Sequence, residues 1–246
     1  HRVIALHRAP ELEFEEITNV VPDFPRGWYE LAHLVAEDRI EFTREFWLSR
    51  LPFHPQLEEF LADFFDSVED ISFYLFQKKP EDAFEAEMVY NLKDKGGFFR
   101  GALPAKEEAI AEMKGHFLGV VFPEDYQAFV SIHNGFCKAL DTGLIRVEHI
   151  WEDYQNFQNQ VVKVVQTVSG QPINPVDLIP FYESFGMPFY QCFWTEWFPG
   201  QEMGNVYFSG SSQVISDPTR SHSHPEALSF TTFVDWLLFY LEKVEK

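Results

Sequence analysis

The amino-acid sequence predicts an α+β fold in which helices pack on an antiparallel or mixed β-sheet. Residues 57–68 and 123–133 repeat apolar side chains at positions i, i+3, i+4 and i+7, the spacing of an amphipathic helix. Residues 178–208 instead contain short runs rich in aromatic and β-branched residues, which are typical of strands. We therefore expect residues 178–208 to form most of the sheet and the helices to cover it.

The N-terminal part is expected to contain helices followed by two strands. Residues 1–27 contain three prolines and a glycine, which indicate an irregular lead-in. Residues 28–51 are mostly helical in pattern, and Pro55 opens the amphipathic helix that follows. Residues 71–77 are apolar throughout, whereas residues 85–92 alternate, so we predict a hairpin of two strands. This hairpin either extends the main sheet or forms a small subdomain.

The remaining elements follow from the same patterns. Residues 105–114 and 123–133 are expected to be helices. Residues 151–168 keep a helical period over five turns, so we predict a helix there despite the β-branched run at 161–165. Ser229 is expected to cap a nearly apolar final helix that lies deep against the sheet. The strands expected in the C-terminal half are residues 178–185, 189–197 and 205–208.

The helix at residues 123–133 has clear start and stop signals. Pro123 suits a first helical position because its φ is already helical, and its missing N–H would be unpaired there. Glu124 and Asp125 follow, where the positive end of the helix dipole favours carboxylates. Asn134 and Gly135 accept the left-handed conformation that ends a helix. These signals predict a short, well-capped helix.

This helix and its surroundings resemble the "LPedY…F…NG" pattern of the SUKH superfamily, which contains fungal Smi/Knr-type cell-wall-assembly regulators and bacterial immunity proteins. One departure is Phe122, where the family usually has leucine. The resemblance covers roughly residues 105–245 and implies a non-enzymatic protein-binding module, either a toxin-neutralising protein or a regulatory scaffold. The segments that carry it are residues 109–113, 116–119, 121–136, 177–181, 204–207 and 228–233.

We therefore expect two parts in the chain. Residues 1–104 form N-terminal helices and a β-hairpin, and residues 105–246 form the SUKH-like α+β domain. With 46% hydrophobic residues and 27 phenylalanines, the chain has enough apolar surface for a substantial core. We predict that the phenylalanine-rich residues 57–76 pack against the C-terminal part.

The charge of the chain limits its partners. It has 39 acidic and 19 basic residues, for a formal net charge of -20. Such a field repels phosphates, so nucleic acid and anionic membranes are poor partners. Between Glu148 and Asp217 there are eight acidic residues and one base, Lys163. This stretch suits a basic protein partner, although a solvated acidic face that serves solubility has the same composition. The oligomeric state is left open.

Few residues suggest catalysis or metal binding. The sequence contains no glycine-rich phosphate loop, no G-x-S-x-G elbow and no H-E-x-x-H helix. His222 and His224 alternate on a polar loop but lack a third strong ligand, so we expect no metal and no cofactor. Cys137 and His133 are close enough in sequence for a nucleophile pair, yet a packed cysteine beside a satisfied histidine fits the apolar stripe better. A hydrolase or transferase that uses such residues is the alternative function.

Acidic residues next to tryptophans are the candidates for partner binding. Glu152 and Asp153 form one such pair, and Glu196 lies beside Trp197. Aromatic residues next to carboxylates offer both buried area and charge complementarity, as interface hot spots do. Trp194 is expected to fill the core, whereas Trp197 either fills the core or contacts the partner. The chain has two cysteines and shows no secretory leader, which indicates reduced thiols and a cytoplasmic protein.

Overall fold

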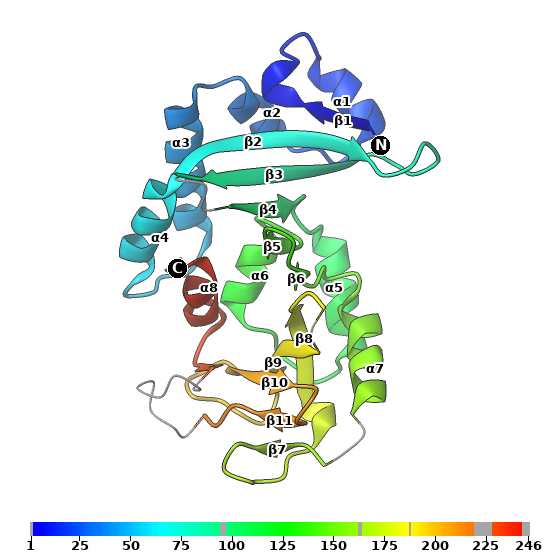
Figure 1. Cartoon of the computed structure of the whole chain (residues 1–246), viewed down its shortest axis with the longest axis vertical. Helices are drawn as coiled ribbons and strands as arrows, with labels where there is room; N and C mark the ends of the chain where they lie inside the picture. Colours follow the sequence, from blue (N-terminus) through cyan, green and yellow to red (C-terminus); the bar gives the residue numbers. More distant parts are fainter. Residues whose placement is uncertain (1, 94–96, 162–163, 187, 219–227, 243–246) are drawn as a thin grey trace.

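The computed structural model of the chain describes residues 2–93, 97–161, 164–186, 188–218 and 228–242. It contains helices and two sheets in which nearly every strand pair is antiparallel, so the predicted α+β fold is confirmed. The two sheets lie at different levels of the long axis, and helices of the C-terminal half occupy the space between and beside them (Figure 1).

The first sheet is built mainly from the N-terminal part. Its strands are β1 (Arg2–Ala5), β2 (Val68–Gln77), β3 (Glu85–Leu92), β4 (Phe98–Ala102) and β5 (Phe136–Lys138), in that order across the sheet. The predicted hairpin is confirmed as β2 and β3, which pair antiparallel from Phe76↔Glu85 to Val68↔Leu92. The hairpin belongs to this sheet and not to the sheet of residues 178–208. Strand β5, from the C-terminal part, completes it.

The second sheet contains the three strands predicted for residues 178–208. They are observed as β8 (Leu178–Glu183), β9 (Phe189–Trp194) and β10 (Asn205–Ser209), all antiparallel. Across the sheet the order is β6-β8-β9-β10-β11-β7, and β12 pairs with β10. The other strands are β6 (Gly143–Leu144), β7 (Gln166–Thr167), β11 (Val214–Ile215) and β12 (Ser229–Phe230).

The helices cover the sheets and fill the space between them (Figure 1). Helices α2, α3 and α4 pack on β2, and α7 packs on β8. Helix α8 is buried along most of its length and contacts α4 and α6. The α-helices are α1 (Phe14–Val20), α2 (Arg26–Ala32), α3 (Ala36–Arg50), α4 (Leu57–Asp66), α5 (Glu107–His116), α6 (Glu124–Val130), α7 (Ile150–Gln160) and α8 (Phe233–Leu241); η1 (Leu6–Arg8) and η3 (Pro175–Asp177) are 3-10 helices.

Two local predictions are wrong near element ends. Helix α7 stops at Gln160 instead of continuing to residue 168, and the backbone of Val161 is already extended. The preference of β-branched residues for extended backbone therefore outweighs the helical period; residues 162–163 lie outside the described part of the chain. Ser229 does not cap α8 but pairs in β12. The cap is Thr232, whose hydroxyl accepts a hydrogen bond from the Asp235 N–H.

The expected irregular lead-in is also wrong in part. Residues 2–5 pair with β2 as an edge strand, and α1 begins with a capping box formed by Glu13 and Glu16. The prolines of this segment lie between the short helices and strands, so these elements still form. Strand β4 was not predicted at all. Its five residues include Arg100 and Gly101, which break the apolar pattern of a buried strand.

A buried hydrogen-bond chain joins the N-terminal part to His133, three residues after the end of helix α6. The Trp47 indole Nε1–H donates to the Tyr90 hydroxyl at 3.2 Å, and that hydroxyl donates to His133 Nε2 at 2.7 Å. His133 Nδ1–H donates to the Ala102 carbonyl at 3.0 Å, because a carbonyl can only accept. Burial lowers the pKa of His133 to about 4, so the ring is neutral.

Aromatic packing surrounds this chain. The Trp47 ring, fully buried, lies 5.3 Å from the Phe129 ring and 5.8 Å from the Phe136 ring. Aromatic pairs at such distances add to the apolar burial of each ring. Residues from both sides of position 104 thus share one continuous core. The division into residues 1–104 and 105–246 stays a prediction.

Asp125 ties the start of α6 to the start of α8. Its carboxylate accepts hydrogen bonds from the N–H groups of Tyr126 and Val234, both at 2.8 Å. Burial nevertheless raises the pKa of Asp125 to about 6, above the ordinary value of 3.8. Because the folded chain holds this proton more tightly than the unfolded chain, the stabilisation is present at low pH and is lost as the pH rises from about 4 through 6.

We therefore expect the stability of the Asp125→Asn variant, relative to the original chain, to increase with increasing pH. The amide oxygen can still accept from Val234 N–H, but it carries no charge. Between pH 4.5 and 7.5, the free energy of unfolding of the variant should rise relative to the original chain by about 2 kcal/mol. Urea denaturation at both pH values measures this difference.

Asp235 provides a control of opposite sign at the same helix. Burial alone would raise the pKa of Asp235, but hydrogen bonds from Thr231, Thr232 and His54 lower it below the ordinary value. Its stabilising contribution is therefore present above pH 4 and is lost as the pH falls. Asp235→Asn should therefore change little relative to the original chain between pH 4.5 and 7.5, and its cost should shrink only as the pH falls below about 4. If Asp235→Asn shows the same rise between pH 4.5 and 7.5 as Asp125→Asn, the assignment of the Asp125 pKa is wrong.

Candidate binding pocket

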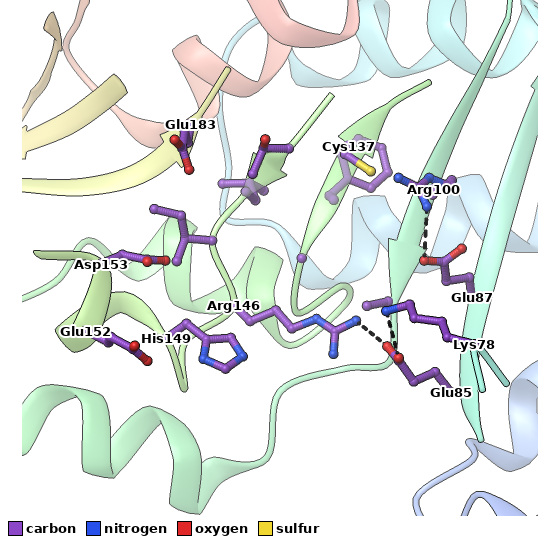
Figure 2. A pocket seen from close by; sticks show the side chains of 16 residues that line it. Lys78, Glu85, Glu87, Arg100, Cys137, Arg146, His149, Glu152, Asp153 and Glu183 are labelled. Atoms are coloured by element: carbon purple, nitrogen blue, oxygen red, sulfur yellow. Dashed lines mark hydrogen bonds and ion pairs between the residues drawn. The ribbon is translucent and has the colours of Figure 1, made fainter. Parts of the chain in front are cut away.

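A pocket of about 720 Å³ opens between the two sheets, and we call it the inter-sheet pocket. Strands β3, β4 and β5 of the first sheet line one side, and β6, β8 and the first turn of α7 line the other. Figure 2 shows its charged side chains in two groups that face each other. The pocket therefore has two walls of different electrostatic character.

The first group, the paired wall, consists of Lys78, Glu85, Glu87, Arg100 and Arg146. Glu85 accepts from Lys78 Nζ at 3.0 Å and from Arg146 Nη2 at 3.1 Å, and Arg100 Nη1 lies 3.5 Å from Glu87 Oε1 (Figure 2). These charges largely neutralise one another. Burial raises the pKa of Glu85, but the Lys78 hydrogen bond and the nearby cations outweigh it and lower the value. Burial raises the pKa of Glu87, which Arg100 offsets only in part.

Strand geometry places the carboxylates of the paired wall. Side chains of β3 alternate between the core and the pocket, so Glu85 and Glu87 share one face while Ala86 and Met88 are buried on the other. On the neighbouring strand, Arg100 lies on the same face as Glu87 and can reach it diagonally. The alternation expected for residues 85–92 thus determines which carboxylates reach the pocket.

Asn134 and Gly135 place Arg146 and the start of α7. Gly135 has a φ of +103°, which a glycine adopts without strain, and Arg146 Cγ packs directly over it, 3.1 Å from where a Cβ would lie. The Asn134 amide donates to both carboxylate oxygens of Glu148 and accepts from the Val147 N–H. Asn134 and Gly135 therefore hold residues 146–148 at the mouth of the pocket, immediately before α7.

The second group, the acidic wall, consists of Glu152, Asp153 and Glu183. Glu152 and Asp153 belong to the first turn of α7, and Glu183 is the last residue of β8. Burial raises the pKa of Asp153, which His149 offsets only in part. Burial also raises the pKa of Glu183, which a hydrogen bond from the Tyr190 hydroxyl offsets only in part, and the negative charge of Asp153 raises it further. Within the described part of the chain, no lysine or arginine forms an ion pair with any of the three. Asp153 and Glu183 are thus partly desolvated and repel each other, whereas Glu152 is exposed.

The thiol in this pocket is not activated. Burial raises the pKa of Cys137, so little thiolate forms near neutral pH. His133 cannot act as its base, because both ring nitrogens are hydrogen-bonded to Tyr90 and Ala102 in the core. Among the described residues, no group of three or more His, Cys, Asp or Glu side chains could hold a metal ion. His222 and His224 lie outside the residues that the structure describes.

The four predicted partner-binding residues fall in two places. Glu152 and Asp153 line the inter-sheet pocket, whereas Glu196 and Trp197 do not. Glu196 is exposed in the loop after β9. Trp197 is half-buried, and its ring packs so closely on Gly204 that a Cβ there would lie 2.4 Å from it. Trp194 is also half-buried, 6.5 Å from the Trp197 ring, so it does not fill the core completely.

Sequence reasoning missed the other charged residues of the pocket. Glu183 lies in a correctly predicted strand, and Glu85 and Glu87 lie in another, but their meeting depends on how the two sheets are placed. Arg146 lies in a loop without a recognisable pattern. In the sequence, the alternation of Glu85 and Glu87 indicates that strand β3 has a polar side. It does not indicate which residues lie opposite that side.

The chain combines a two-sheet α+β fold with a charged pocket between the sheets. The SMI1 / KNR4 family (SUKH-1) matches residues 104–236, which is more than half of the 246 residues, and the chain belongs to this family. The resemblance found in residues 105–245 is therefore confirmed. No curated protein and no solved structure matches the chain. None of the described helices is long and apolar enough to cross a membrane.

Proposed function

We propose that the chain is a non-enzymatic protein-binding module of the regulatory or immunity type, and that its inter-sheet pocket holds a basic segment of a partner protein. The observation that carries the proposal is the acidic wall. Asp153 and Glu183 repel each other in a partly desolvated site and lack a lysine or arginine partner among the described residues. A lysine or arginine side chain of a partner would offset both the repulsion between these carboxylates and their loss of hydration.

A protein segment fits this site better than a small molecule. A second pocket of about 470 Å³ adjoins the first and shares Glu85, Arg146 and His149 with it. The first pocket is lined mainly by charged and polar side chains, whereas small-molecule sites are mostly apolar. The net charge of -20 also favours encounter with a basic protein. Family membership supports a regulatory or immunity-type role. A cytoplasmic location, which the two free cysteines favour, is part of the same proposal.

Association kinetics test the proposal once affinity capture from the native cell has supplied the partner. The triple variant Glu152→Gln, Asp153→Asn, Glu183→Gln removes the charge of the acidic wall and keeps the shape of each side chain. We expect it to slow association by about tenfold at low salt, because surface charges mainly steer encounter. The difference should shrink at high salt, since the Debye length falls from about 30 Å at 0.01 M to about 3 Å at 1 M.

A matched control separates the pocket from the net charge. Glu41, Glu58 and Glu59 are exposed on α3 and α4, and their change to glutamine alters the net charge by the same amount. Association of this control should change by less than about twofold. If both variants slow association equally, the pocket is not the binding site. An acidic partner, or one whose association is independent of salt, would also contradict the proposal.

A further inference from the structure

A separate pocket of about 530 Å³ opens where four segments of the chain meet, and we call it the Phe53 pocket. The segments are the loop of residues 52–54, the start of α6, the loop of residues 199–202 and the start of α8. None of its lining residues belongs to the inter-sheet pocket. One of the four segments comes from the N-terminal part of the chain, and the others come from the family-matched part.

Phe53 lies at this pocket and is 94% exposed. The loop around it is firmly anchored. Pro52 precedes it, and the side chain of His54 is only 15% exposed and hydrogen-bonds to Asp235 at 3.0 Å. The N–H of Gln56 donates to His54 Nδ1 at 3.3 Å, so both ring nitrogens are engaged. Because His54 already fixes the loop, a partner that covers Phe53 would have to order little more than the phenylalanine side chain.

The charges beside Phe53 are negative. Glu124, Asp125 and Glu202 line the pocket, and among its described lining residues there is no lysine or arginine. Glu124 is exposed, and the Glu202 carboxylate is fixed at the pocket by a hydrogen bond from the Glu124 N–H at 2.8 Å. An aromatic ring and carboxylates that line one pocket match the chemistry of an arginine or lysine side chain, which binds both.

We propose that the Phe53 pocket is a second docking surface, for a protein segment that carries an arginine or lysine beside an apolar residue. The cation lies over the Phe53 ring and reaches Glu124 and Glu202, while the apolar residue packs beside Phe53 against Pro199. A second copy of this chain is a poorer occupant, because it would bring a net charge of -20 to an acidic pocket. The proposal does not depend on the function assigned to the inter-sheet pocket.

An NMR titration of the full chain with a defined peptide tests this proposal. The probe is the capped hexapeptide acetyl-Gly-Leu-Arg-Leu-Arg-Gly-amide, and its reference has citrulline in place of both arginines. We expect the arginine peptide to shift the amide signals of Gly200, Gln201 and Thr232 and to saturate. Citrulline keeps the shape and loses the charge, so the reference should bind more weakly by about fivefold or more.

Variants locate the binding surface. Phe53→Ala should weaken binding of the arginine peptide by about fivefold, and the double variant Glu124→Gln, Glu202→Gln should have the same effect. Phe53 is exposed, so its removal leaves the core intact. Phe42→Ala is the control, because Phe42 is 57% exposed on α3, outside the Phe53 pocket. The Phe42→Ala variant should bind the arginine peptide with unchanged affinity.

Several results would overturn the proposal. They are an absence of saturable shifts at the pocket, equal binding of the citrulline peptide, or equal binding by Phe53→Ala. Sedimentation velocity adds one more: a concentration-dependent dimer that Phe53→Ala abolishes would assign the surface to self-association. Loss of binding at the inter-sheet pocket would not affect these outcomes, so the two proposals can fail separately.

Discussion

Gly101→Ala should lower the free energy of unfolding by about 3 kcal/mol or prevent folding. A Cβ at this position would lie 2.2 Å from His133 Nδ1 and 2.4 Å from its Cε1. The imidazole cannot move away, because it is fully buried, hydrogen-bonded at both nitrogens and stacked on Phe136. Chemical denaturation followed by tryptophan fluorescence measures the loss.

Gly115→Ala is the matched control for this experiment. Gly115 lies in α5, and a Cβ there would meet nothing within 4 Å. Alanine favours a helix over glycine by up to about 1 kcal/mol, so this variant should be as stable as the original chain or slightly more stable. If Gly101→Ala is also within about 1 kcal/mol of the original chain, the buried His133 network is not rigid.

A chain that starts at residue 105 should lose cooperative unfolding, although the family match begins at residue 104. The deletion removes Trp47 and Tyr90, and it removes β4, with which β5 pairs. Phe129 and Phe136, both fully buried in the whole chain, would then face water. The exposure of large aromatic side chains costs about 2 to 3 kcal/mol each, which is comparable with the stability of a small domain.

Calorimetry and binding of a hydrophobic dye measure this effect. We expect the fragment to bind the dye and to show no sharp transition. Addition of a separate chain of residues 1–104 should restore part of the transition, since the two pieces share one core. A fragment that melts cooperatively at the temperature of the whole chain would show that residues 1–104 form an independent domain.

The elements predicted correctly from the sequence are those whose pattern is local. β2, β3, β8, β9 and β10 are long enough to show apolar runs or alternation, and the start of α6 at Glu124 lies one residue from the predicted start at Pro123. Helix α6 ends at Val130 with Ser131 as its C-cap, so the prediction that Asn134 and Gly135 end it is wrong. β5 and β6 have three and two residues, too few for any period. α7 shows the limit of periodicity, because the valines after Gln160 satisfy both a helical stripe and a strand.

The candidate site was only half predictable for a similar reason. Glu152 and Asp153 are adjacent in the sequence, and their acidity is visible there. The other walls of their pocket come from elsewhere in the chain. Glu183 lies on strand β8, and the paired wall lies on the opposite side of the pocket from Glu152 and Asp153. Tertiary contacts decide which carboxylates have a cationic partner. One example is the contact between Glu85 and Arg146, which are 61 residues apart in the sequence. No spacing in the sequence indicates such a pair.

Charge reversal with rescue is the measurement that tests the central claim most directly. The claim is that Asp153 and Glu183 hold a basic side chain of a protein partner. Once the partner is captured and its basic residue at the pocket is identified by cross-linking, Asp153→Lys should weaken the complex by about tenfold or more. Reversal of the partner's base to glutamate in the same complex should recover most of that loss. A doubly reversed complex no tighter than the single reversals would contradict the account.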